Sequence, residues 1–354
     1  MKIAYFAWIN TSQESGVLKK ISKQIAAWSQ RGITVKLFAL SPSLYVCDCL
    51  ENISVEVIQC SRIRSGLIKS GSLFSRLLDW KPDVIYYRYL CYFPSLSTIM
   101  KKTPTFLEIN SYDVAEYRVS YSKVINFYHT HTREFVLKNA KGMFFLTPET
   151  AKNYIKYKKP HEIIGDSIDF NQYPLCDAPS NEFPRLVFMG LGISPWFGVD
   201  KVIQMAKNFP KWNFDLIGSS KVEIGEELPE NVIAHGRLSR SEYEKIVIKA
   251  DIGIGTMALH RIYMNETTPL KVREYLAYGI PTIIGYKDPD LPEDLPFILS
   301  LPNCENNVQD NLNEIRAFVE KWKGKRLPRA SISHLGIDVK ENQRLELIRN
   351  YRNS

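Results

Sequence analysis

Apolar runs and amphipathic stretches alternate along the whole chain. Short runs rich in β-branched and aromatic residues are separated by helix-length segments whose apolar positions recur with helical spacing. Buried parallel strands covered by helices on both faces produce this pattern. Because the alternation occurs twice, we predict an α/β protein of two doubly wound, Rossmann-like domains.

The strands expected in the first half are residues 3–7, 34–40, 55–58, 84–87, 105–109, 142–146 and 161–164. Helices are expected over 17–30 and, as one long helix, over 114–138. In the second half we expect strands at 185–189, 214–217, 232–234, 251–255 and 282–285, and helices at 199–208, 241–249 and 269–278.

A polar, proline-containing stretch separates the two series. We therefore place a first domain at 1–168, a linker at 169–184 and a second domain at 185–330. The last segment, 331–354, is expected to hold a helix, and whether it packs back on the first domain stays open. Open α/β sheets bind ligands beyond the carboxyl ends of their strands, so two facing domains are expected to form a cleft.

Composition indicates an ordinary globular protein. The 354 residues are 45% hydrophobic and 24% charged, and no apolar run reaches the roughly 18 residues of a membrane span. The six cysteines lack the paired spacing of a zinc site. We expect reduced thiols and a cytoplasmic protein, with peripheral attachment to the inner face of the membrane left open.

Positive charge is concentrated in the first half. Residues 1–170 hold 23 Lys and Arg against 14 Asp and Glu, whereas residues 171–354 hold 23 against 24. The asymmetry suggests an anionic partner for the first half, either a phosphorylated acceptor or an acidic membrane face. The basic residues are scattered rather than gathered in a recognised motif, so nucleic acid is not expected.

The stretch from Glu266 to Gly285 is predicted to form a loop, a helix and a strand. Thr268 is predicted as the N-cap and Pro269 as the first helical residue, with a stop at Gly279. The positive end of such a helix suits a diphosphate. Lys271 in the first turn opposes the helix dipole, and an anion nearby would explain it.

The two glutamates are expected to flank that anion site, one in the loop and one about one and a half turns into the helix. A carboxylate at that depth can accept hydrogen bonds from sugar hydroxyls, as acidic residues do with ribose. The alternative is that both are solvated charges on a helix surface.

Glu266 and Glu274, followed by Tyr-Leu-Ala-Tyr-Gly-Ile-Pro, resemble the donor-site motif of the retaining glycosyltransferases of family four, which have the two-domain GT-B fold. Further landmarks occur in the family's order along nearly the whole chain. They are Glu14-Ser-Gly16-Val, Phe106-Leu-Glu108-Ile-Asn110, Gly165-Asp-Ser-Ile-Asp169, Met189-Gly190-Leu-Gly192 and His235-Gly236-Arg237.

The resemblance implies transfer of a sugar from a nucleotide diphosphate donor with retention, without a metal and with no cofactor, a UDP sugar being favoured over a GDP sugar. It implies that Glu266 assists catalysis, with Glu108 and Asn110 on the acceptor side, and that Glu274 grips the ribose. The residues implied to bind the nucleotide sugar are Gly16, Gly190, Gly192, Gly218, Arg237, Thr268, Pro269, Leu270, Lys271 and Glu274.

The chain departs from the family at two places. The family commonly places an Arg and a Lys for the diphosphate after the first strand of the second domain, where this chain has Leu191 and Trp196-Phe197. The candidate substitutes are Lys201, Arg261 and Lys271. A histidine that often ends a first-domain strand is also missing, and Glu108 and Asn110 stand there instead.

Four other features invite a functional interpretation. We interpret Gly190-x-Gly192 as a tight turn rather than a dinucleotide fingerprint, and Asp288-Pro-Asp290 as an exposed turn rather than a metal site. His129 and His131 point to different helix faces, so we expect solvated or interfacial histidines. Segment 61–82 is basic and apolar, and both a membrane surface and a helix packed on its own sheet stay open.

The leading hypothesis is therefore a transferase that acts on a glycan or lipid-linked acceptor at the cytoplasmic membrane face, in cell-surface polysaccharide or glycoconjugate synthesis. Two alternatives remain. One is a nucleotide-sugar epimerase of the same fold, which needs no acceptor. The other is a non-catalytic subunit that only binds the nucleotide sugar.

Overall fold

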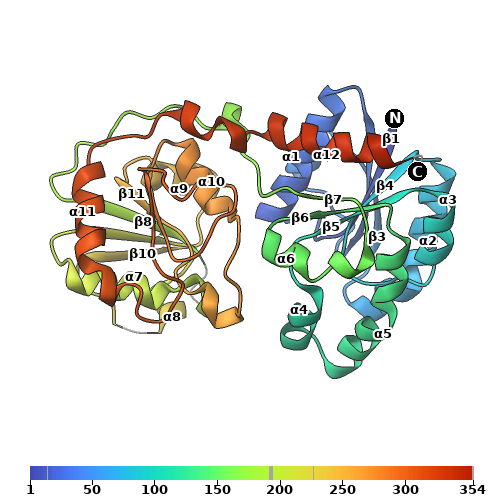
Figure 1. Cartoon of the computed structure of the whole chain (residues 1–354), viewed down its shortest axis with the longest axis horizontal. Coiled ribbons are helices and arrows are strands. Elements are labelled where there is room, and N and C mark those ends of the chain that lie inside the picture. The colour runs from blue at the N-terminus through green and yellow to red at the C-terminus, as the bar shows by residue number, and fades with distance from the viewer. Residues whose placement is uncertain (14, 191–193, 226, 353–354) are drawn as a thin grey trace. The chain divides into compact units, whose positions relative to one another are not determined.

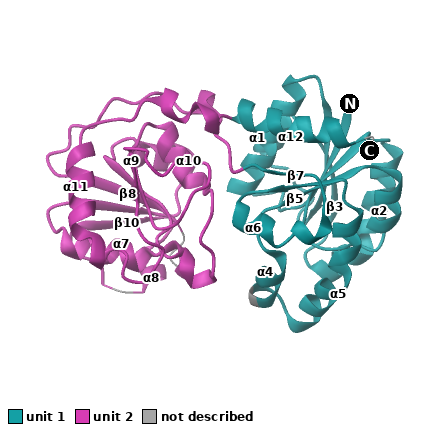
Figure 2. Cartoon of the chain, in the orientation of Figure 1, with its two compact units in different colours: residues 1–164, 337–354 teal, residues 165–336 magenta. Residues whose placement is uncertain are grey.

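The computed structural model describes residues 1–13, 15–190, 194–225 and 227–352 (Figure 1). The chain divides into two compact units (Figure 2). Unit 1 comprises Met1–Ile164 and Ile337–Ser354, and unit 2 comprises Gly165–Gly336. The chain therefore enters unit 2 once and returns to unit 1 for its last helix.

Unit 1 is built on a seven-stranded parallel sheet in the order β3-β2-β1-β4-β5-β6-β7. Its strands are β1 (Lys2–Trp8), β2 (Thr34–Ser41), β3 (Ser54–Gln59), β4 (Val84–Arg88), β5 (Thr105–Ile109), β6 (Gly142–Phe145) and β7 (His161–Ile163). Its helices are α1 (Gly16–Gln30), α2 (Ile63–Asp79), α3 (Leu96–Lys102), α4 (Asp113–Ser120), α5 (Lys123–Asn139), α6 (Pro148–Lys152) and α12 (Ile337–Tyr351).

Alternate side chains of each strand feed two cores, one on each face of this sheet. Phe6 of β1 faces the core that α2, α3 and α5 cover, whereas its neighbour Tyr5 faces the core under α1 and α12. The last helix is fixed to α1 by a buried hydrogen bond of 2.8 Å from Trp28 Nε1 to Glu341 Oε2. The C-terminal segment thus completes the hydrophobic core of unit 1.

The long helix expected over 114–138 is wrong, because the chain forms α4 and α5 with a break at Tyr121 and Ser122. Both residues have extended backbones, with ψ of 158° and 155°. The ring of Tyr121 stacks on that of Tyr117 at 4.3 Å between centroids. The first residue of the break therefore packs against a ring of α4.

Unit 2 has a six-stranded parallel sheet in the order β10-β9-β8-β11-β12-β13. Its strands are β8 (Arg185–Met189), β9 (Asn213–Ile217), β10 (Val232–Gly236), β11 (Ile252–Ile254), β12 (Thr282–Ile284) and β13 (Ile298–Ser300). Its helices are α7 (Val199–Asn208), α8 (Lys221–Ile224), α9 (Arg240–Val247), α10 (Leu270–Ala277) and α11 (Leu312–Trp322). The predicted pair of doubly wound parallel-sheet domains is confirmed.

In both sheets the strand order reverses beside the first strand of the unit, at β1/β4 and at β8/β11. Doubly wound sheets bind ligands at such switch points, beyond the carboxyl ends of the strands. Among the described residues, no helix combines the length and the apolarity that a membrane span requires.

Candidate functional site

The candidate site of unit 2 lies at the carboxyl edge of its sheet, beside the β8/β11 switch point. Gly190 follows β8, Gly218 follows β9, and α10 leads from the loop after β11 into β12. Three segments that are distant in sequence therefore reach one edge of the sheet. Gly192, also expected to bind the donor, lies outside the described residues.

The two glycines bring strand ends together more closely than other residues allow. Gly218 has a φ of +99°, and a Cβ there would lie 2.8 Å from the carbonyl oxygen of Gly190. A Cβ on Gly190 would lie 2.8 Å from the ring of Phe188 and 3.2 Å from Lys271 Nζ. Side chains at these positions would fill the space in front of α10.

Lys271 holds a buried ammonium in the first turn of α10. Its Nζ lies 4.1 Å from the ring centroid of Phe188 and 4.5 Å from that of Phe197. Among the described residues it has no hydrogen-bond partner. Burial lowers the pKa of this amine to about 7. Aromatic faces attract a cation but accept no hydrogen bond in the way that an oxygen does, so the N–H donors of this ammonium are available to an anion.

The other two candidate cations are already bound by protein groups. Lys201 Nζ donates to the carbonyl oxygens of Glu305 and Cys304. Arg261 forms a bidentate pair with Asp200 at 2.9 and 2.7 Å. Of the three substitutes considered for the family's basic pair, Lys271 alone keeps its donors unused among the described residues.

Helix α10 begins differently from the prediction, which is wrong on two counts. Pro269 is the N-cap rather than the first helical residue, with a ψ of 137°. Thr268 is not the cap, because its Oγ1 accepts a hydrogen bond from the backbone N–H of Asp166 at 3.1 Å. The first helical N–H groups are therefore those of Leu270 and Lys271, which have no carbonyl one turn earlier in the helix to bind.

The end of α10 was predicted correctly. Gly279 has a φ of +77°, its N–H bonds the carbonyl of Leu276, and the N–H of Ile280 bonds that of Tyr275. This is the Schellman arrangement that glycine favours after a helix. The Tyr275 hydroxyl accepts a 2.8 Å hydrogen bond from the N–H of Met189, which ties α10 to the end of β8.

The interpretation of Asp288-Pro-Asp290 as an exposed turn is wrong. Asp288 is buried and forms a bidentate pair with buried Arg273 of α10, at 2.7 and 3.0 Å. Arg273 also contacts Asp290 at 3.1 Å and donates to the carbonyl of Asp166 at 2.9 Å. The loop folds inward because the guanidinium inside α10 requires anionic partners. These contacts fix the start of α10.

The two predicted glutamates lie on either side of the start of α10. Glu266 is partly buried, and its backbone pairs with that of Lys287 in an isolated parallel β-bridge before the helix. Glu274 is partly buried and accepts a 3.1 Å hydrogen bond from the hydroxyl of Tyr243. Arg237, expected near the base, is exposed and lies 3.4 Å from Glu223.

The candidate residues of unit 1 gather at its own switch point. Glu108 is buried near the end of β5, with Lys20 at 2.9 Å, Arg88 at 3.5 Å and the hydroxyl of Tyr5 at 3.1 Å. Burial alone would raise its pKa, but the nearby cations outweigh that effect and lower the pKa to about 2. Glu108 is therefore a permanent anion.

Two further unit 1 candidates lie at this same edge. The Oδ1 atom of Asn110, which follows β5, lies 3.4 Å from Lys20 Nζ. Gly16 is the exposed first residue of α1, after Ser15, whose hydroxyl caps the helix by accepting from the N–H of Leu18 at 3.1 Å.

The expectation that both histidines of α5 are solvated or interfacial is wrong for His129. Its side chain is buried, and its Nε2 lies 2.8 Å from Asp113, which also forms a bidentate pair with Arg133. Burial opposes ionisation of Asp113, yet these hydrogen bonds hold its pKa well below the usual range. His129 and Arg133 lie one turn apart on the helix face that packs on the sheet, whereas His131 is exposed.

The complete fold is similar to solved glycosyltransferase-type structures. Sucrose-phosphate synthase from Thermosynechococcus elongatus superposes with a TM-score of 0.73 at 13% identity, over 99% of this chain and 98% of that chain. HepE of Anabaena, in complex with UDP-glucose, gives 0.68 at 15% identity, over 99% of this chain and 100% of that chain. A UDP-N-acetylglucosamine 2-epimerase of Listeria monocytogenes, so named provisionally, gives 0.59 at 11% identity, over 99% and 96%.

These similarities establish the fold, and the GT-B architecture that the resemblance implies is confirmed. No protein-family model and no curated protein sequence matches the chain significantly.

Proposed function

We propose that this protein is a retaining, metal-independent glycosyltransferase that moves a sugar from a UDP sugar to a glycan or lipid-linked acceptor. The observation that carries the proposal is the buried ammonium of Lys271, without a hydrogen-bond partner among the described residues, in the first turn of α10. A diphosphate is the group that such a cation and the free N–H groups of a helix start would bind together.

The proposed chemistry separates binding from bond cleavage. The Lys271 ammonium and the N–H groups of Leu270 and Lys271 stabilise the charge that develops on the departing diphosphate. Glu274 binds the ribose hydroxyls, and Glu266 holds hydroxyls of the transferred sugar and assists catalysis. Gly218 and Arg237 lie on the side proposed for the base.

In unit 1 the proposed acceptor-side residues are Glu108 and Asn110. A carboxylate with a pKa of about 2 does not carry a proton at neutral pH. Glu108 therefore acts by holding Lys20 in place, and Asn110 is the residue left to contact an acceptor hydroxyl. The enzyme is proposed to work at the cytoplasmic membrane face in synthesis of cell-surface polysaccharide or glycoconjugate.

A melting-temperature panel with UDP, GDP, ADP and their sugars tests the proposal. We expect UDP and UDP sugars to raise the melting temperature most, and nucleotide release to require an acceptor. Glu274→Ala is expected to weaken donor binding by about 1 kcal/mol or more through lost sugar hydrogen bonds. Glu266→Ala is expected chiefly to lower kcat.

Failure of every nucleotide to shift the melting temperature would contradict donor binding itself, and wild-type kinetics in both variants would contradict the assignment of the two glutamates. An epimerase is the second candidate, because an epimerase-type structure shares the fold. Acceptor-independent interconversion of UDP sugars would favour that activity, and binding with neither reaction would favour a non-catalytic subunit.

Proton uptake on nucleotide binding is a separate expectation. The pKa of Lys271 is lowered to about 7 in the free protein, and a bound diphosphate favours the charged amine. Above pH 7, UDP binding should therefore take up a proton, and affinity should fall as the pH rises. Calorimetry in buffers of different ionisation heat measures this uptake, and Lys271→Met should abolish the part that belongs to the protein.

The lowered pKa of Lys271 also predicts in which direction the folding stability of the free protein changes with pH. Because the folded pKa of about 7 lies below the ordinary 10.5, the unfolded chain binds more protons between these values. Folding stability should therefore increase with pH across this window. A stability that decreases there through Lys271 would contradict the assigned burial.

A further inference from the structure

Helix α5 carries apolar side chains on the side turned away from its sheet. Val124, Phe127 and Phe135 are 59%, 66% and 54% exposed. At about 100° per residue, these three and His131 fall within about 80° of one another around the helix axis. We call Val124, Phe127, His131 and Phe135 the α5 stripe. Large apolar groups gathered on one exposed helix face mark an interaction surface.

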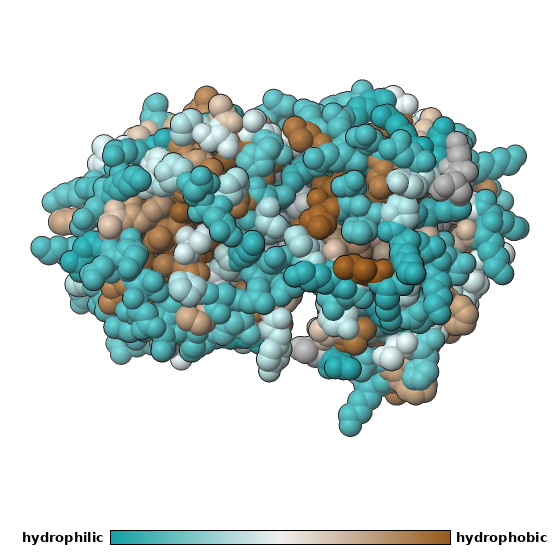
Figure 3. Space-filling model, viewed as in Figure 1, coloured by the Kyte–Doolittle hydropathy of each residue, from teal (hydrophilic) through white to brown (hydrophobic). Residues whose placement is uncertain are grey.

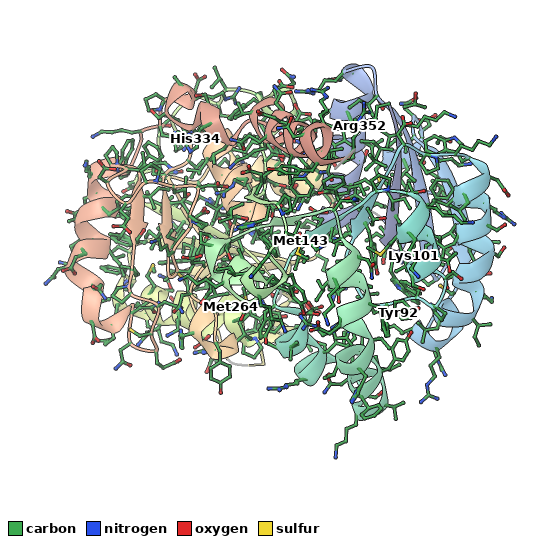
Figure 4. The ribbon with its side chains drawn as sticks, turned by 45° about the vertical axis from the view of Figure 1, so that its right-hand side comes forward. Tyr92, Lys101, Met143, Met264, His334 and Arg352 are labelled. Atoms are coloured by element: carbon green, nitrogen blue, oxygen red, sulfur yellow. The ribbon has the colours of Figure 1, made fainter. Side chains whose placement is uncertain are left out.

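The stripe is a packed surface rather than a set of separate side chains. The ring of His131 lies 4.0 Å from that of Phe127 between centroids. The ring of Phe135 lies 5.5 Å from that of Tyr92, in the loop before α3. Tyr92 is labelled in Figure 4 beside the helices of unit 1, and Figure 3 shows apolar-coloured atoms over the region of α5.

Helix α2, the segment first considered for membrane contact, does not offer such a surface. Its Leu73, Phe74 and Leu77 belong to the core of unit 1. Ile68 is its single large apolar side chain that is mostly exposed, at 84%. Its basic residues therefore surround one apolar group, whereas α5 presents a continuous row.

Exposed basic side chains lie on α5 and on the helices beside it. The exposed basic residues on α5 and on the helices packed against it are Lys101, Lys102, Arg118, Lys123 and Lys138. Lys138 lies 3.5 Å from Glu134 of the same helix. Glu134 is otherwise occupied by the hydroxyl of Tyr157 at 2.6 Å and by Lys156 at 3.3 Å. At about 100° per residue, Lys123 lies about 40° from Phe127 around the helix axis and Lys138 falls within the arc of the stripe, so the two exposed lysines of α5 itself border it.

The positive charge beside the α5 stripe favours one of two possible binding partners, a second copy of the chain or an anionic lipid surface. A second copy of the chain would bring the same patch, and so the same cations, against each other in a two-fold interface. An anionic lipid surface offers headgroups to the lysines and an apolar layer to the phenylalanines. A membrane of anionic phospholipid would therefore contact both the apolar side chains of the α5 stripe and the lysines beside it.

We propose that this protein lies on an anionic lipid surface through the α5 stripe and takes an acceptor carried in that surface. The second part rests on the proposed function. Strand β5 ends at Ile109, and α4 begins four residues later at Asp113. Helix α5 begins at Lys123, three residues after α4 ends at Ser120, so it follows the connection that leaves the carboxyl end of β5. That is the edge where Asn110 lies and where such sheets bind ligands.

Vesicle sedimentation of the full chain tests the proposal, with phosphatidylcholine alone and with phosphatidylcholine mixed with phosphatidylglycerol. Wild type should bind the mixed vesicles and release them as salt rises. Phe127→Ser with Phe135→Ser should weaken this binding about tenfold or more. Lys123→Gln should weaken it about fivefold. Ile68→Ser on α2 is the matched control and should bind as wild type does.

Equal binding by the double serine variant, or loss of binding in Ile68→Ser alone, would overturn the proposal. So would a wild-type dimer that the double variant converts to a monomer, because the stripe would then be a contact between copies. The melting temperature with UDP, measured on the same variants, keeps the two proposals apart. A missing UDP shift with intact vesicle binding contradicts the donor site and not the stripe.

Discussion

Lys271→Met is expected to weaken UDP binding by roughly 10- to 150-fold while leaving unit 2 as stable as the wild type or more stable. A hydrogen bond to a charged group contributes about 1.5–3 kcal/mol, which corresponds to that range. Methionine keeps the length and the apolar stem of lysine. It also removes a buried amine that has no hydrogen-bond partner among the described residues, so the free protein loses little.

Lys201→Met is the matched control for this prediction. Lys201 is also buried, but its ammonium donates to the carbonyls of Glu305 and Cys304. Its removal should lower the free energy of unfolding by about 1–3 kcal/mol and leave UDP affinity unchanged. Titration calorimetry and urea unfolding measure both quantities. UDP binding by Lys271→Met at wild-type strength would refute the role proposed for this lysine.

The two sheets could be predicted because buried parallel strands form nearly continuous apolar runs. The expected strands 105–109 and 185–189 coincide with β5 and β8. Strand β13 was missed, since Ile298–Ser300 is short and only partly buried at the edge of its sheet. Helix α11 was also missed, although its apolar positions have helical spacing. The break between α4 and α5 falls at Tyr121 and Ser122, whose extended backbones periodicity does not reveal.

The parts of the site that depend on residues close together in sequence could be predicted. The parts that depend on contacts between segments distant in sequence could not. Gly279 correctly predicted the end of α10. Lys271 was a candidate ligand for an anion because its charge opposes the helix dipole. The Lys271 ammonium lies between the rings of Phe188 and Phe197. This position depends on contact between three segments that are separate in sequence. The burial of Asp288 likewise depends on Arg273, because a Pro-rich loop taken alone favours an exposed turn.

Arg273→Met is expected to lower the free energy of unfolding of unit 2 by about 3–5 kcal/mol. Removing one partner of a buried ion pair leaves the other charge without compensation, and Asp288 is buried with both carboxylate oxygens facing Arg273. The loss also frees the start of α10 from the carbonyl of Asp166. UDP binding should therefore weaken together with stability, unlike in Lys271→Met.

Arg261→Met tests whether burial, rather than pairing, is responsible. Arg261 forms the same bidentate arrangement with Asp200, but both side chains are partly exposed, so its loss should cost about 0–1 kcal/mol. Arg273→Met combined with Asp288→Asn should recover part of the lost stability, because the amide leaves no unpaired charge behind. Urea unfolding of the full chain measures all three variants. Equal losses in Arg273→Met and Arg261→Met would show that the buried guanidinium does not hold α10 in place.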